Sequence, residues 1–399
     1  MHYTNWDYLI IGAGIVGITL ARELNLRYPN AKIVILEKEK TLGLHASGRN
    51  SGVLHTGIYY PANTLKAKFC KEGADLLFNY AQEHQIPVRK DGKVIVATSV
   101  ENARGLEQLL ENAKANQICA EKIGPSEILT LEPYACSDFG GIYCKDTAVI
   151  DSQQVLSKLK NELSRNKINI IFNQTVSQIN AEHNEVQTQN ASYSYGMLIN
   201  AAGSYADSIA KLVNIGLEYT LIPFKGIYYK LDPSVAHTVR TSIYPVPNPS
   251  LPFLGVHFTR VINGDVYVGP TAIPALGREN YTLFGGINAI ESMSILKQLI
   301  KLYGRNEQGF RQLVKKEMSH YTRLGFINSA QCLMKELKPS WIKASRKVGI
   351  RPQLLNTKDM RLEMDFIIKP GKNSVHVLNS ISPAFTSSFA VARHIVDGI

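Results

Sequence analysis

The first forty residues alternate between short apolar runs and one amphipathic stretch. Residues 8–11 and 33–36 are apolar or aromatic throughout and predict short buried strands. Between them, residues 15–26 carry apolar side chains at helical spacing. This order of strand, helix and strand predicts the opening βαβ unit of a doubly wound sheet.

The rest of the chain shows the same two patterns, apolar residues at helical spacing and short apolar runs. Helical spacing predicts helices over residues 64–83, 101–116, 152–164, 289–302, 308–317 and 386–396. Short apolar runs predict strands over residues 93–98, 168–172, 197–200, 366–368 and 375–378. Residues 219–271 are rich in Tyr, Val, Pro and Phe in short alternating runs, which are typical of an antiparallel sheet. We therefore expect one sheet assembled from separated stretches, with an antiparallel sheet inserted between them.

The net charge restricts the class of partner. The 399 residues hold 44 Lys and Arg against 33 Asp and Glu, which gives a formal charge of +11. This excess favours an anionic partner, such as a carboxylate substrate, a phosphorylated cofactor or an acidic lipid surface. Nucleic acid is disfavoured, because the basic residues are spread along the chain without a Lys/Arg block or an RNA-binding signature.

The cysteines and the N-terminal apolar stretch bear on the compartment. The five cysteines form no CxxC pair, which favours reduced thiols over a disulfide framework or a zinc site. Residues 9–21 are too short to span a bilayer, contain three glycines and follow no basic leader. We expect a cytoplasmic protein without a metal centre, whose basic residues also allow peripheral attachment to the inner face of a membrane.

A glycine motif lies at the junction of the first strand and helix. At the spacing of Gly12, Gly14 and Gly17, the first glycine allows a tight turn, the second the approach of a pyrophosphate and the third close helix packing. The N-terminus of the following helix supplies N–H groups for phosphate. Glu37 ends the second strand, where a carboxylate accepts hydrogen bonds from ribose hydroxyls and repels a 2′-phosphate. The motif predicts a bound dinucleotide, either FAD or NAD.

A second polar, glycine-rich loop follows at residues 47–52, with the sequence SGRNSG. Such a loop suits a cofactor with more to hold than NAD, because the ribityl chain and flavin of FAD extend beyond the pyrophosphate. An ordinary surface loop is the alternative, since Gly, Ser and Asn are also the usual turn residues.

Several motifs elsewhere are much more specific than the glycine turn. They are HTGIYY at residues 55–60, NAAGSYAD at 200–207, PFLGVHFTR at 252–260, GIRPQ at 349–353 and NSISPAFTSS at 379–388. With these motifs, almost the whole chain resembles the L-2-hydroxyglutarate dehydrogenase/oxidase family, a branch of the D-amino-acid-oxidase-like flavoproteins. The resemblance implies an enzyme that uses FAD to oxidise L-2-hydroxyglutarate to 2-oxoglutarate, by hydride transfer from Cα to flavin N5. A quinone, an electron carrier or oxygen would then accept the electrons.

The resemblance also implies an α/β fold of two interleaved domains. An FAD-binding Rossmann-like domain of the glutathione-reductase type would comprise residues 1–80, 140–215 and 345–399. An α+β domain with an antiparallel sheet would bind the substrate and comprise residues 81–139 and 216–344.

Candidate cofactor-binding residues lie in and around these motifs. The glycine turn and the two segments after it contribute Gly12, Gly14, Gly17, Glu37, Lys38, Ser47, Arg49, Asn50, Ser51 and Gly52. The resemblance adds Val176 and Gly203 at the adenosine end, and Ser382 and Pro383 near the flavin ring.

Oxidation of a 2-hydroxy acid requires a base for the hydroxyl proton and cations for the carboxylates. His55 or His257 is the candidate base, because neutral imidazole accepts a proton near pH 7. Arg351 is the candidate carboxylate clamp, with Lys225 and Arg260 as helpers. The alternatives are a structural hydrogen bond for each histidine and a surface salt bridge for each cation.

Three other functions stay open. The first is a flavin enzyme of the same fold that oxidises a D-amino acid or glycerol 3-phosphate. The second is a non-catalytic FAD-binding protein, although His55, His257 and Arg351 are all present. The third is an NAD-dependent dehydrogenase, which the second glycine-rich loop disfavours.

Overall fold

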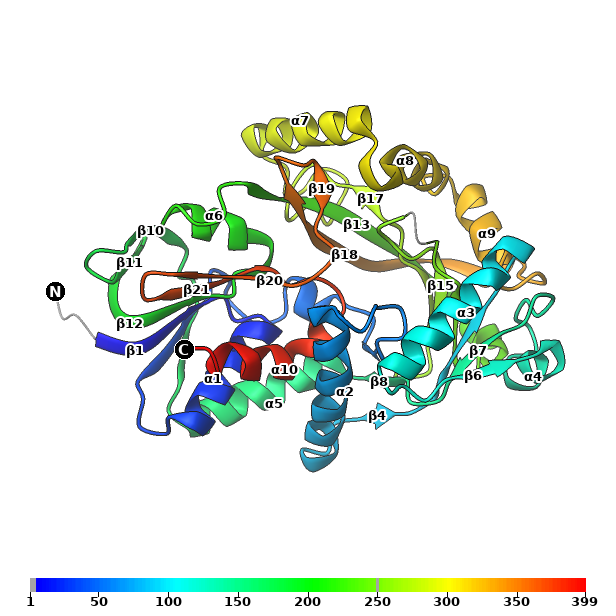
Figure 1. Cartoon of the computed structure of the whole chain (residues 1–399), viewed down its shortest axis with the longest axis horizontal. Helices are drawn as coiled ribbons and strands as arrows, with labels where there is room; N and C mark the ends of the chain where they lie inside the picture. The colour runs from blue at the N-terminus through cyan, green and yellow to red at the C-terminus, as the bar shows by residue number, and fades with distance from the viewer. Residues whose placement is uncertain (1–4, 249–250) are drawn as a thin grey trace. The chain divides into compact units, whose positions relative to one another are not determined.

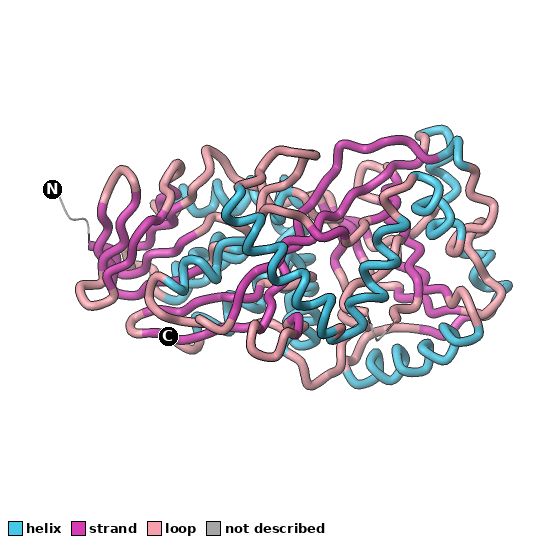
Figure 2. Tube along the Cα trace, turned by 90° about the horizontal axis from the view of Figure 1, so that it is seen from above, coloured by secondary structure: helices cyan, strands magenta, loops and turns pink. Residues whose placement is uncertain are grey.

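The computed structural model of the chain describes residues 5–248 and 251–399. Backbone contacts divide the chain into two units, each built from separated stretches. The first unit comprises Met1–Asn50, Ser152–Pro223 and Arg351–Ile399, and the second comprises Ser51–Asp151 and Phe224–Ile350. Figure 1 shows that each unit holds both helices and strands, and the same mixture is seen from above in Figure 2. The chain is therefore an α/β protein assembled from discontinuous units, as predicted.

The first unit is built on a mostly parallel sheet. Its parallel strands, in spatial order, are β9 (Asn169–Ile171), β2 (Ile33–Leu36), β1 (Asn5–Ile11), β12 (Ser192–Asn200) and β21 (Ser374–Asn379). The hairpin of β10 (Val176–Asn180) and β11 (Glu185–Thr188) lies antiparallel beside β12, and β20 (Ile367–Gly371) pairs antiparallel with β21. All four residues of β2 are buried, which explains why this strand is a continuous apolar run.

Three helices of the first unit pack together, as Figure 1 shows: α1 (Ile15–Arg27), α5 (Ser152–Arg165) and α10 (Ala384–Val396). The buried Thr19 hydroxyl on α1 donates to the backbone oxygen of Ser388 on α10 at 3.1 Å. The last helix of the chain is thus joined to the first, and the predicted helices over residues 15–26 and 386–396 are confirmed.

The second unit is built on a large, mostly antiparallel sheet. In spatial order its strands are β18 (Ile342–Asn356), β13 (Tyr219–Leu231), β16 (Val266–Gly269), β15 (His257–Arg260), β14 (Ser242–Pro245), β5 (Lys93–Val96), β7 (Gly141–Cys144) and β6 (Glu121–Ile123). The pair β14–β5 is parallel, whereas β13–β16, β16–β15, β15–β14, β5–β7 and β7–β6 are antiparallel. The antiparallel sheet predicted over residues 219–271 is confirmed.

The two faces of this sheet have different coverings. Side chains of one face pack into an apolar core with α4 (Pro125–Leu131) and α9 (Arg323–Gln331), and they include Val94, Ile243, Phe258 and Val268. On the other face, Ile95 and Tyr244 pack against α3 (Val100–Ala115). Because successive residues of a strand point to opposite faces, His257 and Thr259 lie on the same face as Tyr244.

The unit boundaries differ from the predicted domain boundaries. The short strands β3 (Val53–Leu54) and β4 (Val88–Arg89) both pair with β8 (Ala148–Ile150). Residues 51–80 and 140–151 belong to the second unit, although we expected them in the cofactor domain. Residues 216–223 lie in the first unit, although we expected them in the substrate domain, and residues 345–350 lie in the second unit, although we expected them in the cofactor domain. Both boundaries fall inside long strands, β13 and β18.

Some elements were not predicted. The helices α4 and α9 were missed, and so was the full 15-residue length of β18, because its Lys, Arg, Gly and Pro residues interrupt the apolar alternation. Between β17 (Ile273–Pro274) and α9 lie α7 (Ala289–Arg305) and α8 (Phe310–Ser319), which match the two helices predicted there.

Candidate functional site

The glycine turn of the first unit has no space for side chains. Gly12 has a φ of +100°, a conformation that L side chains rarely adopt, and its N–H donates to the Leu36 oxygen at 2.8 Å. A Cβ on Gly12 would lie 2.6 Å from the Ala201 oxygen, and a Cβ on Gly17 would lie 1.9 Å from the Gly12 oxygen. The backbone of α1 therefore lies directly against the turn, as dinucleotide binding requires.

The N-terminus of α1 carries the groups needed for an anionic ligand. Its cap residue Gly14 has no side chain, and the hydroxyl of Ser47 accepts the Ile15 N–H at 2.9 Å instead. The hydroxyl of Ser47 remains a donor, because an oxygen that accepts one hydrogen bond keeps its own hydrogen. The helix terminus and Ser47 together fit a pyrophosphate.

Arg49 and Asn50 hold the second glycine-rich loop in place. Arg49 Nε donates to the Leu44 oxygen at 2.6 Å, and Asn50 Nδ2 donates to the Ser47 oxygen at 2.7 Å. These two bonds stabilise the loop internally, and the bond between Ser47 and Ile15 joins the loop to the start of α1. The predicted cofactor residues Gly12, Gly14, Gly17, Ser47, Arg49 and Asn50 are brought together in one unit.

Glu37 is oriented by the backbone at the end of β2. Its Oε2 accepts the Ala13 N–H at 2.8 Å and its Oε1 accepts the Glu39 N–H at 2.9 Å. Each carboxylate oxygen can accept a second hydrogen bond, so that the fixed carboxylate fits the ribose hydroxyls of a dinucleotide.

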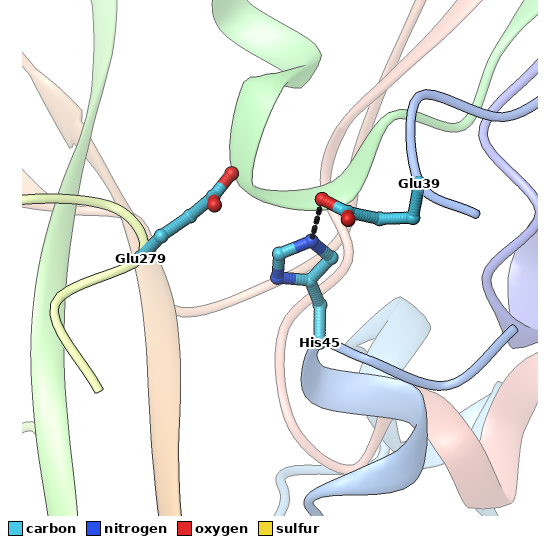
Figure 3. A group of neighbouring side chains, drawn as sticks. All are labelled: Glu39, His45 and Glu279. Carbon is cyan, nitrogen blue, oxygen red and sulfur yellow. Dashed lines mark hydrogen bonds and ion pairs between the residues drawn. The ribbon is translucent and has the colours of Figure 1, made fainter. Parts of the chain in front are cut away.

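Glu39, two residues after Glu37, contacts both Lys38 and His45, and Figure 3 shows its contact with His45. Burial raises the pKa of Glu39, but the hydrogen bonds from Lys38 and His45 outweigh it and lower the pKa overall. The ammonium of Lys38 also lies 5.2 Å from the centre of the Tyr205 ring. Lys38 therefore supports the turn around Glu39. Glu279, the third side chain drawn in Figure 3, belongs to the second unit.

The positions added by the resemblance fall on the first unit. A Cβ on Gly203, at a φ of +54°, would meet no atom within 4 Å, so the space beside it is open. Val176 begins β10 and packs against the core of the unit. Ser382 and Pro383 precede α10, whose N-terminus receives no side-chain cap, while the buried hydroxyl of Ser387 has no hydrogen-bond partner among the described residues.

Ser51 and Gly52 fall on the other side of the unit boundary. The Gly52 oxygen accepts the Ile150 N–H at 2.8 Å, and a Cβ on Gly52 would lie 2.6 Å from the Ile150 oxygen. The backbone of this pair is thus bonded to β8 of the second unit, although we expected both residues in the cofactor domain.

In the second unit, Tyr244 lies between the two candidate histidines. Its ring centre is 4.0 Å from that of His257 and 6.4 Å from that of His55. His257 is buried, and its Nδ1 is 2.9 Å from the Gly255 oxygen. Because a carbonyl only accepts, Nδ1 carries a proton. His55, which follows β3, is only half buried.

The same sheet face carries a lysine that sequence reasoning missed. Lys347 on β18 places its ammonium 4.4 Å from the ring centre of Tyr267 and 5.3 Å from that of Tyr228. Burial lowers the pKa of Lys347 to about 8. Its position two and four residues before Gly349 and Arg351 on one strand was the available signal, because alternate strand residues share a face.

The three predicted cations have different surroundings. Arg351 is half buried on β18. Lys225 donates to Asn280 Oδ1 at 2.8 Å and to the Thr282 oxygen at 3.0 Å, so its ammonium holds the loop that follows β17. Burial lowers the pKa of Lys225. Alternation along β15 puts Arg260 on the face opposite to His257, and its Nη1 donates to the Arg240 oxygen. The structure does not bring Arg260 to the histidine face.

Lys93 is a second missed residue and lies fully buried beneath Tyr244. Its ammonium is 4.5 Å from the ring centre of Tyr59 and 5.1 Å from that of Tyr244, with no hydrogen-bond partner among the described residues. Burial lowers the pKa of Lys93. A buried charge without a hydrogen bond destabilises the folded chain, and the cation–π contacts with the two aromatic rings offset part of this cost.

Replacing Lys93 by Met is expected to raise the free energy of unfolding by about 1–3 kcal/mol, because the replacement keeps the length and removes the desolvated charge. The pKa of Lys93 is lower in the folded chain than in the unfolded chain, where it is near 10.5. The gain in stability from Lys93→Met should therefore shrink as the pH approaches 10.5, because the lysine then loses its proton in the unfolded chain as well. Urea unfolding at several pH values measures both effects. Lys122→Met, at an exposed pair with Glu107, is the control and should change little.

These arrangements define a dinucleotide-binding oxidoreductase. The family model described as FAD dependent oxidoreductase matches residues 7–398. The chain belongs to the FAD-dependent oxidoreductase family and is an enzyme with FAD as its cofactor.

Three relatives indicate the branch of this family to which the chain belongs. The mitochondrial L-2-hydroxyglutarate dehydrogenase of Caenorhabditis elegans is 34% identical over 419 residues, which cover 98% of this chain and 92% of that protein. L-2-hydroxyglutarate dehydrogenase of Escherichia coli strain K12 is 32% identical over 403 residues, covering 99% and 93%. The human mitochondrial protein of the same name is 34% identical over 419 residues, covering 99% and 89%. The predicted family membership is confirmed.

Solved structures share the fold. L-alpha-glycerophosphate oxidase from Mycoplasma pneumoniae superposes with a TM-score of 0.78 at 24% identity, covering 98% of this chain and 94% of that one. Glycine oxidase from Geobacillus kaustophilus gives a TM-score of 0.72 at 15% identity, with the same coverage. The predicted fold class is confirmed, and the roles of the individual site residues stay predictions. Within residues 5–248 and 251–399, no helix combines the length and hydropathy needed to cross a bilayer.

Proposed function

We propose that this protein oxidises L-2-hydroxyglutarate to 2-oxoglutarate. The observation that carries the proposal is the face of the second unit on which His55, Tyr244 and His257 lie with the ammonium of Lys347. A base beside cations is what a hydroxy acid with two carboxylates needs. The names of the relatives support the same substrate.

We assign a separate role in the reaction to each of three residues. His55 takes the proton of the substrate hydroxyl, because imidazole is the usual base near pH 7 and this ring is only half buried. His257 stacks on Tyr244 and is held by Gly255, and we assign it the role of positioning that ring. Arg351 binds a substrate carboxylate with its planar guanidinium. FAD would supply the acceptor for the hydride of the substrate Cα, and Gly12, Ser47 and Glu37 would hold it.

An anaerobic absorbance spectrum tests the proposal. Adding L-2-hydroxyglutarate to the purified, FAD-containing protein should bleach the flavin bands, and 2-oxoglutarate should form in equal amount. D-amino acids and glycerol 3-phosphate serve as comparisons. Bleaching by one of these and not by L-2-hydroxyglutarate would replace the proposed substrate.

We further propose that the protein binds peripherally to an anionic membrane through α7. Five exposed apolar residues recur every three or four positions along this helix: Ile290, Met293, Leu296, Ile300 and Tyr303. Ile290 is 83% exposed, and Phe284 in the preceding loop is 81% exposed. Apolar side chains on the solvent face of a helix are the reverse of the usual pattern in a water-soluble unit.

Basic residues border this apolar face and favour a lipid surface over another apolar protein. Lys297, Lys301 and Arg305 are exposed on α7 itself. A hollow beside α8 is lined by Tyr303, Arg311, Gln312, Val314, Lys315 and Met318. Figure 1 shows α7, α8 and α9 following one another along one edge of the second unit. An apolar helix face with a basic border is typical of interfacial membrane binding.

Vesicle sedimentation tests the membrane proposal. The protein should sediment with vesicles of phosphatidylglycerol and phosphatidylcholine, and much less with phosphatidylcholine alone. The double variant Met293→Glu/Ile300→Glu should lose this binding, because two carboxylates would enter the apolar interface. Leu217→Glu, at an exposed apolar residue of the first unit, is the control. If the double variant instead only abolishes dimerisation, a second copy covers the face and the membrane proposal is wrong.

A further inference from the structure

The ammonium of Lys347 lies in an aromatic box. Tyr228 on β13 and Tyr267 on β16 provide the two ring faces, and their ring centres are 6.2 Å apart at an angle of 82°. No hydrogen bond or ion pair joins the Lys347 ammonium to any residue in the described part of the chain. A half-buried cation in this state is preorganised to receive an anionic group from outside the protein.

Strand register places this box beside the histidines. Tyr229 pairs with Val268, so the preceding residue, Tyr228, comes level with Gly269, and Gly269 in turn pairs with His257. Gly269 has no side chain, and a Cβ there would collide with the Ile227 oxygen at 2.8 Å. Tyr228 on β13, Gly269 on β16 and His257 on β15 therefore lie side by side in a row across the sheet, and no side chain separates Tyr228 from His257.

Tyr244 lies close to this row. Its ring centre is 4.0 Å from that of His257, and after burial the nearby phenol of Tyr228 also contributes to the raised pKa of Tyr244.

We propose that Lys347, in its box of Tyr228 and Tyr267, binds the carboxylate of the substrate that is distant from the hydroxyl. The inference rests on the proposed function and deepens it: Lys347 selects a dicarboxylate over a monocarboxylate. A monocarboxylate of the same length leaves the buried ammonium without a partner, and so binds less well.

Binding of glutarate and butyrate tests the assignment without turnover. Glutarate has two carboxylates and no hydroxyl to oxidise, and butyrate has one carboxylate. In the FAD-containing protein, each Kd is measured by calorimetry or by the change in flavin absorbance. Lys347→Met should raise the Kd for glutarate about 10–100-fold and leave the Kd for butyrate within about twofold. Lys343→Met, at an exposed residue of the same strand that pairs with Asp232, should change neither.

The outcomes separate this inference from the proposed function. An unchanged glutarate Kd in Lys347→Met would overturn the inference, and so would an equal loss for butyrate. Failure of L-2-hydroxyglutarate to bleach the wild-type flavin would overturn the proposed function instead, and the glutarate measurement would still stand. If Lys347→Met does not fold, Lys347→Gln, which keeps a polar group in the box, takes its place with the same expectations.

The pH dependence is an independent readout. Because burial lowers the pKa of Lys347 to about 8, glutarate binding to the wild type should weaken as the pH rises above that value. The titratable groups that face the ammonium from the neighbouring strands are the phenols of Tyr228 and Tyr267. The Lys347→Met variant should lose the pH dependence. A variant that kept it would show that another group is responsible.

Discussion

Replacing His55 by Asn is expected to slow flavin reduction by L-2-hydroxyglutarate about 10²–10⁴-fold, because the substrate hydroxyl loses its proton acceptor. Asn is similar in size and makes hydrogen bonds, so the half-buried position should remain filled. Anaerobic stopped-flow absorbance measures the reduction rate directly, without the later step of reoxidation.

A comparison with His257 assigns the base. His257 is buried and its Nδ1 is engaged by Gly255, so His257→Asn should disturb the stack on Tyr244 and reduce the rate less than His55→Asn does. His237→Asn, at an exposed site, is the control and should react at the normal rate. The reverse order of effects would make His257 the base.

Replacing Arg351 by Ala is expected to raise the KM for L-2-hydroxyglutarate about 30–150-fold, since the variant loses charge-assisted hydrogen bonds to a carboxylate. FAD content should be unchanged, because the groups that fit the pyrophosphate and ribose lie at Gly12, Ser47 and Glu37. Steady-state kinetics and the flavin-to-protein absorbance ratio measure the two quantities.

A matched control for Arg351 lies on the same strand. Arg346 is exposed, and alternation puts it on the other face of β18. Arg346→Ala should therefore leave the KM within about twofold. An unchanged KM in Arg351→Ala, or an equal rise in Arg346→Ala, would remove Arg351 from the substrate site.

Local sequence determined the cofactor turn well. The glycine spacing, the helix after it and the carboxylate after β2 all follow one another within forty residues. Backbone conformation requires glycine at Gly12, and the close approach of the Gly12 oxygen requires glycine at Gly17. Gly12 has a φ of +100°, and a Cβ on Gly17 would lie 1.9 Å from the Gly12 oxygen. Only glycine meets these local constraints. Such positions can be read without knowing the rest of the fold.

The cationic residues could not be placed in the same way. Arg260 and Lys225 are near the right motifs, yet alternation turns Arg260 to the opposite face and loop residues occupy the ammonium of Lys225. Lys347 and Lys93 stand in no recognisable motif, and their roles depend on aromatic rings contributed by other strands. Charge and residue type do not reveal such partners.

By itself, the sequence determined the class of fold, the dinucleotide turn, most of the helices and the family, because periodicity and glycine geometry are properties of neighbouring residues. Only the tertiary structure decided which strands pair, where β13 and β18 pass from one unit to the other, and which side chains share the histidine face. The physical reason is that strand register joins residues far apart in the chain, and a shift of one residue would turn each side chain to the other face of the sheet.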